Sequence, residues 1–401
     1  MRFDSTLYYH VGEDYLWPVL FDEMHETVGL LDELGYTGVW LAEHHFAWDG
    51  WYRSGSNPIL FGADVARFSD RLRIGQCGVV VPDWHPLRLA EDIAFLDQAT
   101  KGRVDFGIGP GMKSRACMNF HQAGDRRDRA RNKRLFEEAL DVVLVALYQE
   151  SFSHKGEFYE FPAPGWIDNK MLQNPKYHAE NGEVVKMAIS PRPYQERLPI
   201  YQMAESKGST RVCAQRGIGT MSQGLSPGRS LENWKLYQQV AIETHGRPYA
   251  LGEGMAMMRP CYVAETQDQA EKDCKEGYNL LGQWGSHGLY KDWTPMVIEE
   301  ELEPGDEDLT FFDFQIKPGM LLIGSPDNVA AQIERLNNEV GCQHLALFLN
   351  IPLLSFEQVK RSITLFAEEI MPRFMSADER AQAGLIGKKE QDFGSQIHHG
   401  R

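Results

Sequence analysis

The six cysteines of this 401-residue chain are scattered, and no C-x-x-C pair occurs. They are Cys77, Cys117, Cys213, Cys261, Cys274 and Cys342. Zinc knuckles are recognised by such pairs, and disulfide frameworks by dense cysteines at regular spacings. The sequence therefore indicates neither class, and it predicts a protein of a reducing compartment, the cytoplasm.

Long hydrophobic runs and positive charge are scarce as well. No stretch reaches the roughly 18 apolar residues of a membrane-spanning helix, and the N-terminus has no apolar signal segment. Lys and Arg number 41 against 57 Asp and Glu, which gives a net charge of −16. Such a surface repels phosphate backbones and anionic lipids, so we expect neither nucleic acid nor membrane as a partner.

One basic run stands out against this acidic background. The segment "DRRDRARNKR", residues 125–134, leads into an amphipathic stretch. Interspersed aspartates favour the solvated start of a helix, although its cations can also meet an anionic ligand.

What the chain does contain is a regular alternation of strand-like and helical segments. Strands are predicted at residues 3–9, 38–42, 73–81, 103–109, 198–204, 218–222, 258–264 and 344–350. Helices are predicted at 20–35, 86–100, 132–149, 209–217, 230–246, 266–282, 326–340 and 355–370. Eight such strands predict an α/β fold, a (β/α)8 TIM barrel with its active site at the strand C-termini.

Two segments interrupt this rhythm. Residues 151–197 are rich in proline, glycine and aromatics, and residues 283–319 include a strongly acidic stretch. We interpret them as long insertions after strands 4 and 7, either functional walls or extra packing and dimer surface. The barrel is expected to be a single domain over residues 1–375, followed by a flexible C-terminal tail at 376–401.

Polar residues follow the second predicted strand directly. The segment "GVWLAEHHF" runs from a buried strand into Glu43, His44 and His45, without a metal-ligand spacing. A barrel whose site lies at the strand ends would bring these side chains to that site.

This segment is part of a wider resemblance. The run "EHHF", Asn57-Pro58, the block from Gly78 to Gly111 and "MAESKGST" at 203–210 together resemble the bacterial luciferase-like flavin monooxygenases, over residues 3–374. The resemblance implies a dimeric barrel that binds reduced FMN supplied by a separate flavin reductase. It further implies reaction with dioxygen to a C4a-peroxyflavin, and hydroxylation or Baeyer-Villiger oxidation of an apolar or aromatic small molecule.

Individual positions take roles from this resemblance. His44 matches the family's active-site histidine, and an imidazole can donate a hydrogen bond and relay a proton. His45 is expected to point to the opposite side of the strand, if the strand continues that far, and to serve packing. Glu43 either binds flavin or anchors the loop.

The flavin ring has its own expected contacts. Alignment through Pro82 places the family's non-prolyl cis peptide at Cys77 and Gly78, beneath the ring. Gly109, at the end of the fourth strand, permits close approach of the backbone to flavin or substrate. Luciferases carry a phosphate-binding arginine in this region that is missing here, and Lys113 or Arg115 can take its place.

The cofactor phosphate is expected at the fifth strand-to-helix junction. Glu205, Ser206, Ser209 and Thr210 match the family's phosphate-side motif, and a helix N-terminus presents free N–H groups to an anion. Ordinary N-capping by Ser206 or Ser209 is the alternative.

Substrate contacts are predicted from loop aromatics. Trp48, Trp51, Tyr52 and Trp84 follow the second and third strands and can wall an apolar pocket. Surface or dimer packing explains them as well.

Three other functions remain open. The same barrel can use the deazaflavin F420 for hydride transfer, or bind flavin without catalysis. A metal-dependent barrel hydrolase is suggested by the histidines alone, because such enzymes commonly carry H-x-H on the first strand and the chain offers a single His10 there. We therefore predict no metal site.

Overall fold

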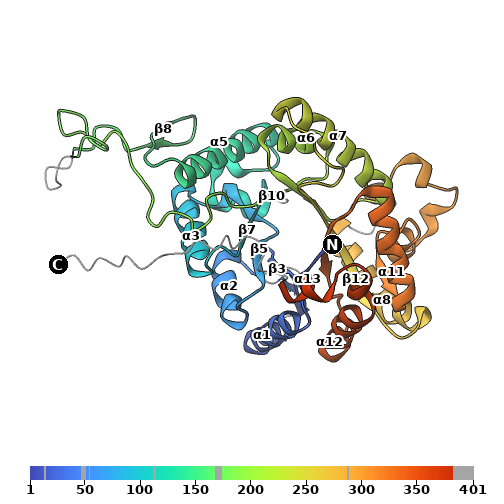
Figure 1. Ribbon diagram of the computed structural model, residues 1–401. Coiled ribbons are helices and arrows are strands. Elements are labelled where there is room, and N and C mark those ends of the chain that lie inside the picture. The colour runs from blue at the N-terminus through green and yellow to red at the C-terminus, as the bar shows by residue number, and fades with distance from the viewer. Residues whose placement is uncertain are drawn as a thin grey trace.

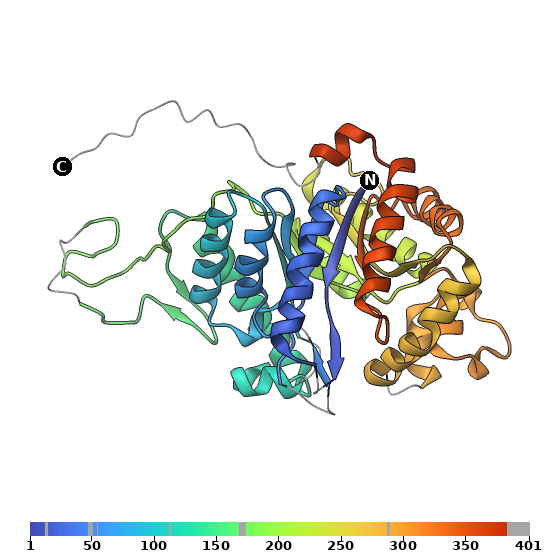
Figure 2. The same ribbon diagram turned by 90° about the horizontal axis from the view of Figure 1, so that it is seen from below.

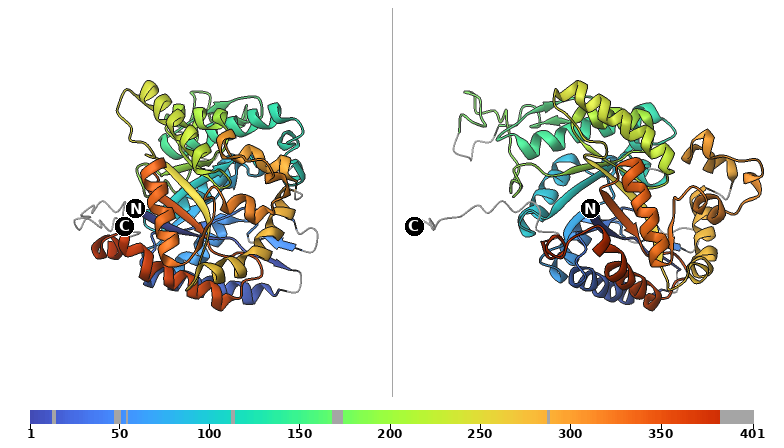
Figure 3. Two further views of the ribbon diagram at one scale, coloured as in Figure 1. Left: turned by 90° about the vertical axis from the view of Figure 1, so that its right-hand side faces the viewer. Right: turned by 45° about the vertical axis from the view of Figure 1, so that its right-hand side comes forward.

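The computed structural model describes residues 1–12, 15–46, 51–53, 55–111, 114–167, 174–286 and 289–382. A cylinder of strands lies inside a ring of helices (Figure 1). Two further directions show the same arrangement (Figure 3).

Eight parallel strands close into a barrel, and they correspond to the eight strands that the sequence predicts. They are β1 (Arg2–Leu7), β3 (Gly38–Leu41), β5 (Arg73–Gln76), β7 (Val104–Gly109), β10 (Ile200–Met203), β11 (Gly219–Ser222), β12 (Met255–Val263) and β14 (His344–Phe348). Each pairs with the next in this order, and β14 pairs with β1. The (β/α)8 TIM barrel prediction is confirmed.

The helices of the outer ring follow these strands. They are α1 (Trp17–Glu33), α2 (Pro58–Val65), α3 (Pro86–Ala99), α5 (Arg129–Tyr148), α6 (Lys207–Arg216), α7 (Pro227–His245), α8 (Gln267–Ser286), α11 (Pro326–Arg335) and α12 (Phe356–Leu365). The last two continue as short π-helical turns at Leu336–Val340 and Phe366–Ile370.

Helix α2 was not predicted. It is only 8 residues long, which is too short for an amphipathic repeat to stand out. Its start is nevertheless encoded, because the Asn57 side chain accepts hydrogen bonds from the N–H groups of Ile59 and Leu60, and Pro58 occupies the first helical position.

Both long insertions are present, and they extend from opposite sides of the barrel (Figure 2). The first, between α5 and β10, contains the short pair β8 (His154–Lys155) and β9 (Glu160–Phe161). The second lies between α8 and α11 and contains the short helices α9 (Tyr290–Trp293) and α10 (Phe311–Ile316). Strand β13 (Leu322–Gly324) extends the sheet beside the end of β12.

Smaller elements complete the description. A two-stranded ribbon of β2 (His10–Gly12) and β4 (Trp51–Arg53) follows β1 and β3, and β6 (Val79–Val80) follows β5. Helix α4 (Ser114–Phe120) follows β7. Helix α13 (Ala377–Gln382) forms the first part of the predicted flexible tail, whose remainder, 383–401, lies outside the described residues.

Strand β1 shows how the barrel interior is divided. Its side chains alternate in direction, with Phe3 and Leu7 in the layer under the helices. Arg2 and Asp4 enter a buried charge network, while Thr6 lines a cavity. One strand therefore contributes to two different regions of the interior.

The N-terminal end of the barrel is filled by that charge network. Asp4 binds Arg2, the indole N–H of Trp40 at 2.6 Å and His344 at 2.7 Å, while Asp105 binds Arg2 and Arg73. All four partners come from different strands, so the network ties the strands together across the interior. Trp40 fits there because β5 has a glycine opposite its ring, where a Cβ would come within 2.4 Å.

No helix among the described residues has the length and apolarity to cross a bilayer. This agrees with the scarcity of long hydrophobic runs in the sequence.

Candidate functional site

A cavity of about 610 Å³ opens at the C-terminal end of the barrel. Its walls are residues at or just beyond the ends of the strands, as expected for an active site of this fold. They include Thr6, Tyr8, Ala42, Glu43, His44, His45, Phe46, Cys77, Gly78, Val80, Asp83, Gly109, Cys117, Arg126, Met203, Glu205, Gln223 and Met258. Its volume is typical of sites for small molecules and cofactors.

His44, the predicted catalytic residue, lines this cavity. Its backbone N–H donates a hydrogen bond of 2.8 Å to the carbonyl of Gly55, which fixes the segment after β3. Its ring centroid lies 5.0 Å from that of Tyr8 at the end of β1. Tyr8 was not among the predicted site residues, although its position one residue past a strand end was a usable signal.

His45 lines the same cavity as His44, and the condition for the expected opposite orientation, a strand that continues to His45, is not met. Strand alternation does not reach these residues, because β3 ends at Leu41 and residues 42–45 are irregular. The Nε2 atom of His45 lies 2.7 Å from Oε1 of Glu43. Its ring also contacts Phe120 of α4, with centroids 4.5 Å apart.

Glu43 is buried, and its carboxylate joins several elements at once. Besides His45, it accepts a 2.8 Å hydrogen bond from the backbone N–H of Val80 and 3.0 Å hydrogen bonds from the indole of Trp84. These contacts satisfy both oxygens, so Glu43 anchors the segments that follow β3 and β5. Loop anchoring was one of its two predicted roles.

The predicted substrate-wall aromatics have different positions. Trp84 is half-buried with its indole N–H directed to Glu43, so it supports that carboxylate and is not among the residues around the cavity. Trp51 and Tyr52 belong to β4, whose backbone pairs with β2, but their side chains are not described. Trp48 lies outside the described residues.

Asp83 lines the cavity but was not predicted as a site residue. It ends a 3-10 turn, Val81–Asp83, between β6 and α3. Burial, together with the charge of Glu43, raises the pKa of its carboxyl group to about 7. The burial of Asp83 could not be predicted from the sequence, because it depends on the packing of α4 against this turn.

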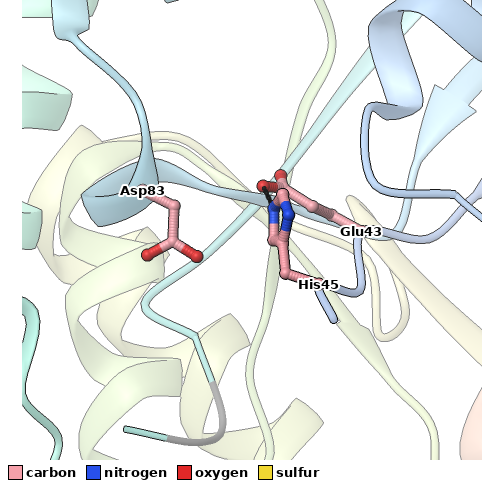
Figure 4. Close-up of side chains that lie close together, drawn as sticks. All are labelled: Glu43, His45 and Asp83. Atoms are coloured by element: carbon pink, nitrogen blue, oxygen red, sulfur yellow. Dashed lines mark hydrogen bonds and ion pairs between the residues drawn. The ribbon is translucent and has the colours of Figure 1, made fainter. Parts of the chain in front are cut away.

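Glu43, His45 and Asp83 lie together (Figure 4). One potential ligand atom from each lies within 4.8 Å of the others, which raises the question of a metal. Two ligands on a tetrahedral ion at about 2.1 Å lie roughly 3.4 Å apart. The 2.7 Å contact between His45 and Glu43 is a hydrogen bond, and the other Glu43 contacts leave little capacity for an ion. The geometry favours a hydrogen-bonded pair, Glu43 and His45, beside the separate carboxyl group of Asp83.

The predicted ring-binding positions also reach the cavity. The Cys77–Gly78 peptide is cis, as the alignment through Pro82 predicts. Both residues line the cavity together with Gly109. A Cβ at Gly109 would meet only that of Met203, at 3.9 Å, so the space beside this glycine is open.

The predicted phosphate motif is divided between cavity and surface. Glu205 lines the cavity, and its Oε1 accepts the backbone N–H groups of Gln223 and Gly224 at 3.1 and 3.0 Å. Ser206 is exposed and caps α6 by accepting the N–H of Ser209 at 3.1 Å. Thr210 is buried. N-capping, the alternative for Ser206, is therefore present, and it leaves phosphate binding at this helix terminus open.

Arg126 is the cation of the basic run that reaches the cavity. Its NH1 donates to Asn132 at 2.8 Å, and burial lowers its pKa. Within the described part of the chain, no carboxylate forms an ion pair with it. Of the two cations predicted to replace the luciferase arginine, Lys113 lies outside the described residues and the Arg115 side chain is not described.

Comparisons with known proteins agree with this geometry. A family model described as luciferase-like monooxygenase matches residues 1–344. The oxygenase component of a flavin-dependent trigonelline monooxygenase from Acinetobacter baylyi is 26% identical, over 93% of this chain and 96% of that protein.

Two solved structures share the fold. The oxygenating constituent of 3,6-diketocamphane monooxygenase from Pseudomonas putida, in complex with FMN, has a TM-score of 0.71 at 19% identity, covering 94% of this chain and 99% of that one. The F420-dependent tetrahydromethanopterin reductase from Methanopyrus kandleri has a TM-score of 0.63 at 15% identity, covering 93% and 99%. At these identities the likeness establishes the fold alone.

Proposed function

The chain belongs to the luciferase-like monooxygenase family, and from this we propose that it is the oxygenase component of a two-component flavin-dependent monooxygenase. It would take reduced FMN from a separate reductase and use dioxygen to hydroxylate, or oxidise in the Baeyer-Villiger manner, an apolar or aromatic small molecule. The observation that carries the proposal is the cavity at the strand ends, which both His44 and the open backbone at Gly109 line.

The residues around the cavity suit a flat ring system with an anionic tail. Bound reduced FMN supplies the electrons for dioxygen activation, while the protein binds, orients and excludes water. We assign cofactor contacts to Glu43, Cys77, Gly78, Gly109, Glu205, Ser206, Ser209 and Thr210. Arg126 is a further cation for an anionic group, and its lack of an ion pair in the described chain supports that role.

His44 is the proposed catalytic residue. An imidazole can give and accept a proton near neutral pH, and the His44 ring faces the cavity rather than the helix layer. Around it, Tyr8, Phe46, Met203 and Met258 supply apolar surface that excludes water from the reacting groups. Trp48, Trp51 and Tyr52 remain proposed substrate contacts.

The decisive test is a cofactor titration. We expect saturable binding of FMN, both oxidised and anaerobically reduced, followed by protein and flavin fluorescence, with F420 titrated in parallel. Gly109→Val should block FMN uptake because it fills the open space beside the backbone. Gly29→Ala, on α1 with no atom near its added methyl, is the matched control. Preference for F420 would support the hydride-transfer alternative, and absence of any flavin uptake would remove the proposal.

We further propose a homodimer formed through α1, α2 and α3, which lie side by side (Figure 1). Leu60 of α2 and Phe95 of α3 are 68% and 63% exposed, and Phe68 between them is 40% exposed. A second copy would cover this apolar surface. Leu60→Glu is expected to yield monomers in analytical ultracentrifugation, whereas Ile242→Glu on α7 should not. Six unpaired thiols support a cytoplasmic location.

A further inference from the structure

The most conspicuous polar group in the cavity that is still unassigned is the Asp83 carboxyl group. Both of its oxygens are buried beside the Cys117 thiol of α4, a weak donor, and neither accepts a hydrogen bond from a backbone N–H or a charged group among the described residues. Burial of a carboxylate without such a partner is costly, so the group needs either a proton or a ligand.

The neighbouring carboxyl group of Glu43 differs from that of Asp83 in its hydrogen bonding. Glu43 has four hydrogen-bond contacts from Val80, Trp84 and His45, and it stabilises the segments it joins. Asp83 extends from the neighbouring turn and lies beside the Glu43–His45 pair without joining it (Figure 4). Asp83 therefore has more unused hydrogen-bonding capacity for a ligand in the cavity than Glu43 has.

The surroundings indicate which ligand group would suit it. Among the residues that the structure describes, three carboxyl groups line the cavity, Glu43, Asp83 and Glu205, and the guanidinium that lines it is that of Arg126. Aromatic rings from Tyr8, Trp17 and Phe46 also line it, and the faces of such rings attract cations. A positively charged nitrogen would therefore be stabilised both by Asp83 and by the aromatic wall.

We propose that Asp83 is a specificity-determining residue that selects substrates carrying a cationic nitrogen, such as a protonated amine or a quaternary ammonium group attached to an aromatic body. This inference rests on the proposed monooxygenase function and adds the substrate class. Neutral substrates of the same shape would leave the carboxyl group buried without a partner.

The charge state of Asp83 then controls binding. Three groups face it: Glu43 and His45 from the segment after β3, and the Cys117 thiol from α4, whose own pKa is raised to about 12. Burial and the Glu43 charge hold the Asp83 pKa near 7, so the empty site is partly protonated at neutral pH. A bound cation stabilises the ionised form, so its binding releases a proton, and affinity should fall as the pH drops below about 7.

The experiment compares two probes of nearly equal shape, phenyltrimethylammonium and tert-butylbenzene, binding to the full chain with and without saturating FMN. At about pH 8, the parent protein is expected to bind the cation about tenfold tighter than the neutral probe. At about pH 6, most of this preference should disappear because Asp83 is protonated. Isothermal titration in two buffers of different ionisation enthalpy measures the released proton.

Asp83→Asn keeps the shape of the side chain and removes its charge. It should reduce the preference to within about twofold at every pH, while Asp92→Asn, an exposed carboxylate on α3, should leave it intact. Equal binding of both probes to the parent, or a preference that survives in Asp83→Asn, would overturn the proposal. So would Zn²⁺ uptake that depends on Asp83, because a metal would then be its ligand.

FMN binding measured in the same samples separates this inference from the proposed function. If FMN binds and the cation preference is missing, only the substrate class is wrong. If FMN does not bind, the monooxygenase proposal fails, and the two probes still report on Asp83.

Discussion

Two buried carboxyl groups, Asp4 at the N-terminal end of the barrel and Asp83 at the C-terminal end, have pKa values displaced in opposite directions. At the N-terminal end, burial alone would raise the pKa of Asp4, but the charges of Arg2 and His344 hold it well below its usual value. At the C-terminal end, burial raises the pKa of Asp83 to about 7, and no ion pair offsets it. Arg2 and Arg73 likewise lower the pKa of Asp105 against its burial. The difference separates an end that is paired for stability from an end that keeps capacity for ligands.

The largest effect is expected from His44→Ala at the cavity end. Substrate oxidation should fall by about 10²–10⁴-fold, because a proton-transferring group is lost, while FMN affinity and unfolding stability stay near parental values. Oxygen uptake coupled to product formation measures this. His25→Ala, at the remote pair with Asp64, serves as control. Equal product from His44→Ala and the parent would remove His44 from its role.

At the other end, Asp105→Asn should lower stability rather than activity per folded molecule. It leaves Arg73, which binds Asp105 at 2.6 Å, buried without its counter-charge, and breaking such a pair costs about 3–5 kcal/mol. Urea unfolding followed by circular dichroism measures the loss. A change smaller than that caused by surface Asp92→Asn would show that the network is not stabilising.

Asp83→Asn should change the free energy of unfolding in the opposite direction to Asp105→Asn. The folded pKa of Asp83 is raised above its unfolded value near 3.8, so ionisation destabilises the fold as the pH rises from about 4 to 7. Above pH 7 the variant should therefore be more stable than the parent, on the order of 1–2 kcal/mol after allowance for water in the cavity, and the difference should vanish near pH 4. Urea unfolding across this pH range measures it. A variant less stable than the parent at pH 8 would contradict the comparison between the two ends.

The smallest effect concerns the terminus of α6. Ser206→Ala removes an N-cap and should cost about 1 kcal/mol of stability, as should Ser355→Ala at the start of α12. If Ser206 also binds the cofactor phosphate, only Ser206→Ala should weaken FMN binding, by several-fold. Similar FMN affinity in both variants would leave capping as the sole role of Ser206.

Much of the fold was predictable because its signals are local. Each barrel strand is a short β-like run between segments of helical periodicity, and all eight were found in this way. Helix α2 was missed because it is short, although Asn57 and Pro58 mark its start. Two predicted helices, at 266–282 and 326–340, both fall between β12 and β14, one on each side of the second insertion.

The candidate site was predictable only in part. The strand-end position of His44 and Glu43 follows from the topology, and so do the glycines beside the cavity. The opposite orientation expected for His45 was conditional on the strand continuing to that residue, and β3 ends at Leu41. The basic run 125–134 was recognised as able to meet an anionic ligand, but neither Arg126 within it nor Asp83 could be singled out, since the cavity that they face is assembled from distant segments.

The charge network around Trp40 affects how ligands enter and leave the cavity. Because this network fills the N-terminal end of the barrel, ligands must enter and leave the cavity through the C-terminal end. A bulky cofactor and an organic substrate that use the same entrance cannot pass each other freely. We therefore expect ordered binding and release, in which excess substrate slows the exchange of the more deeply bound ligand.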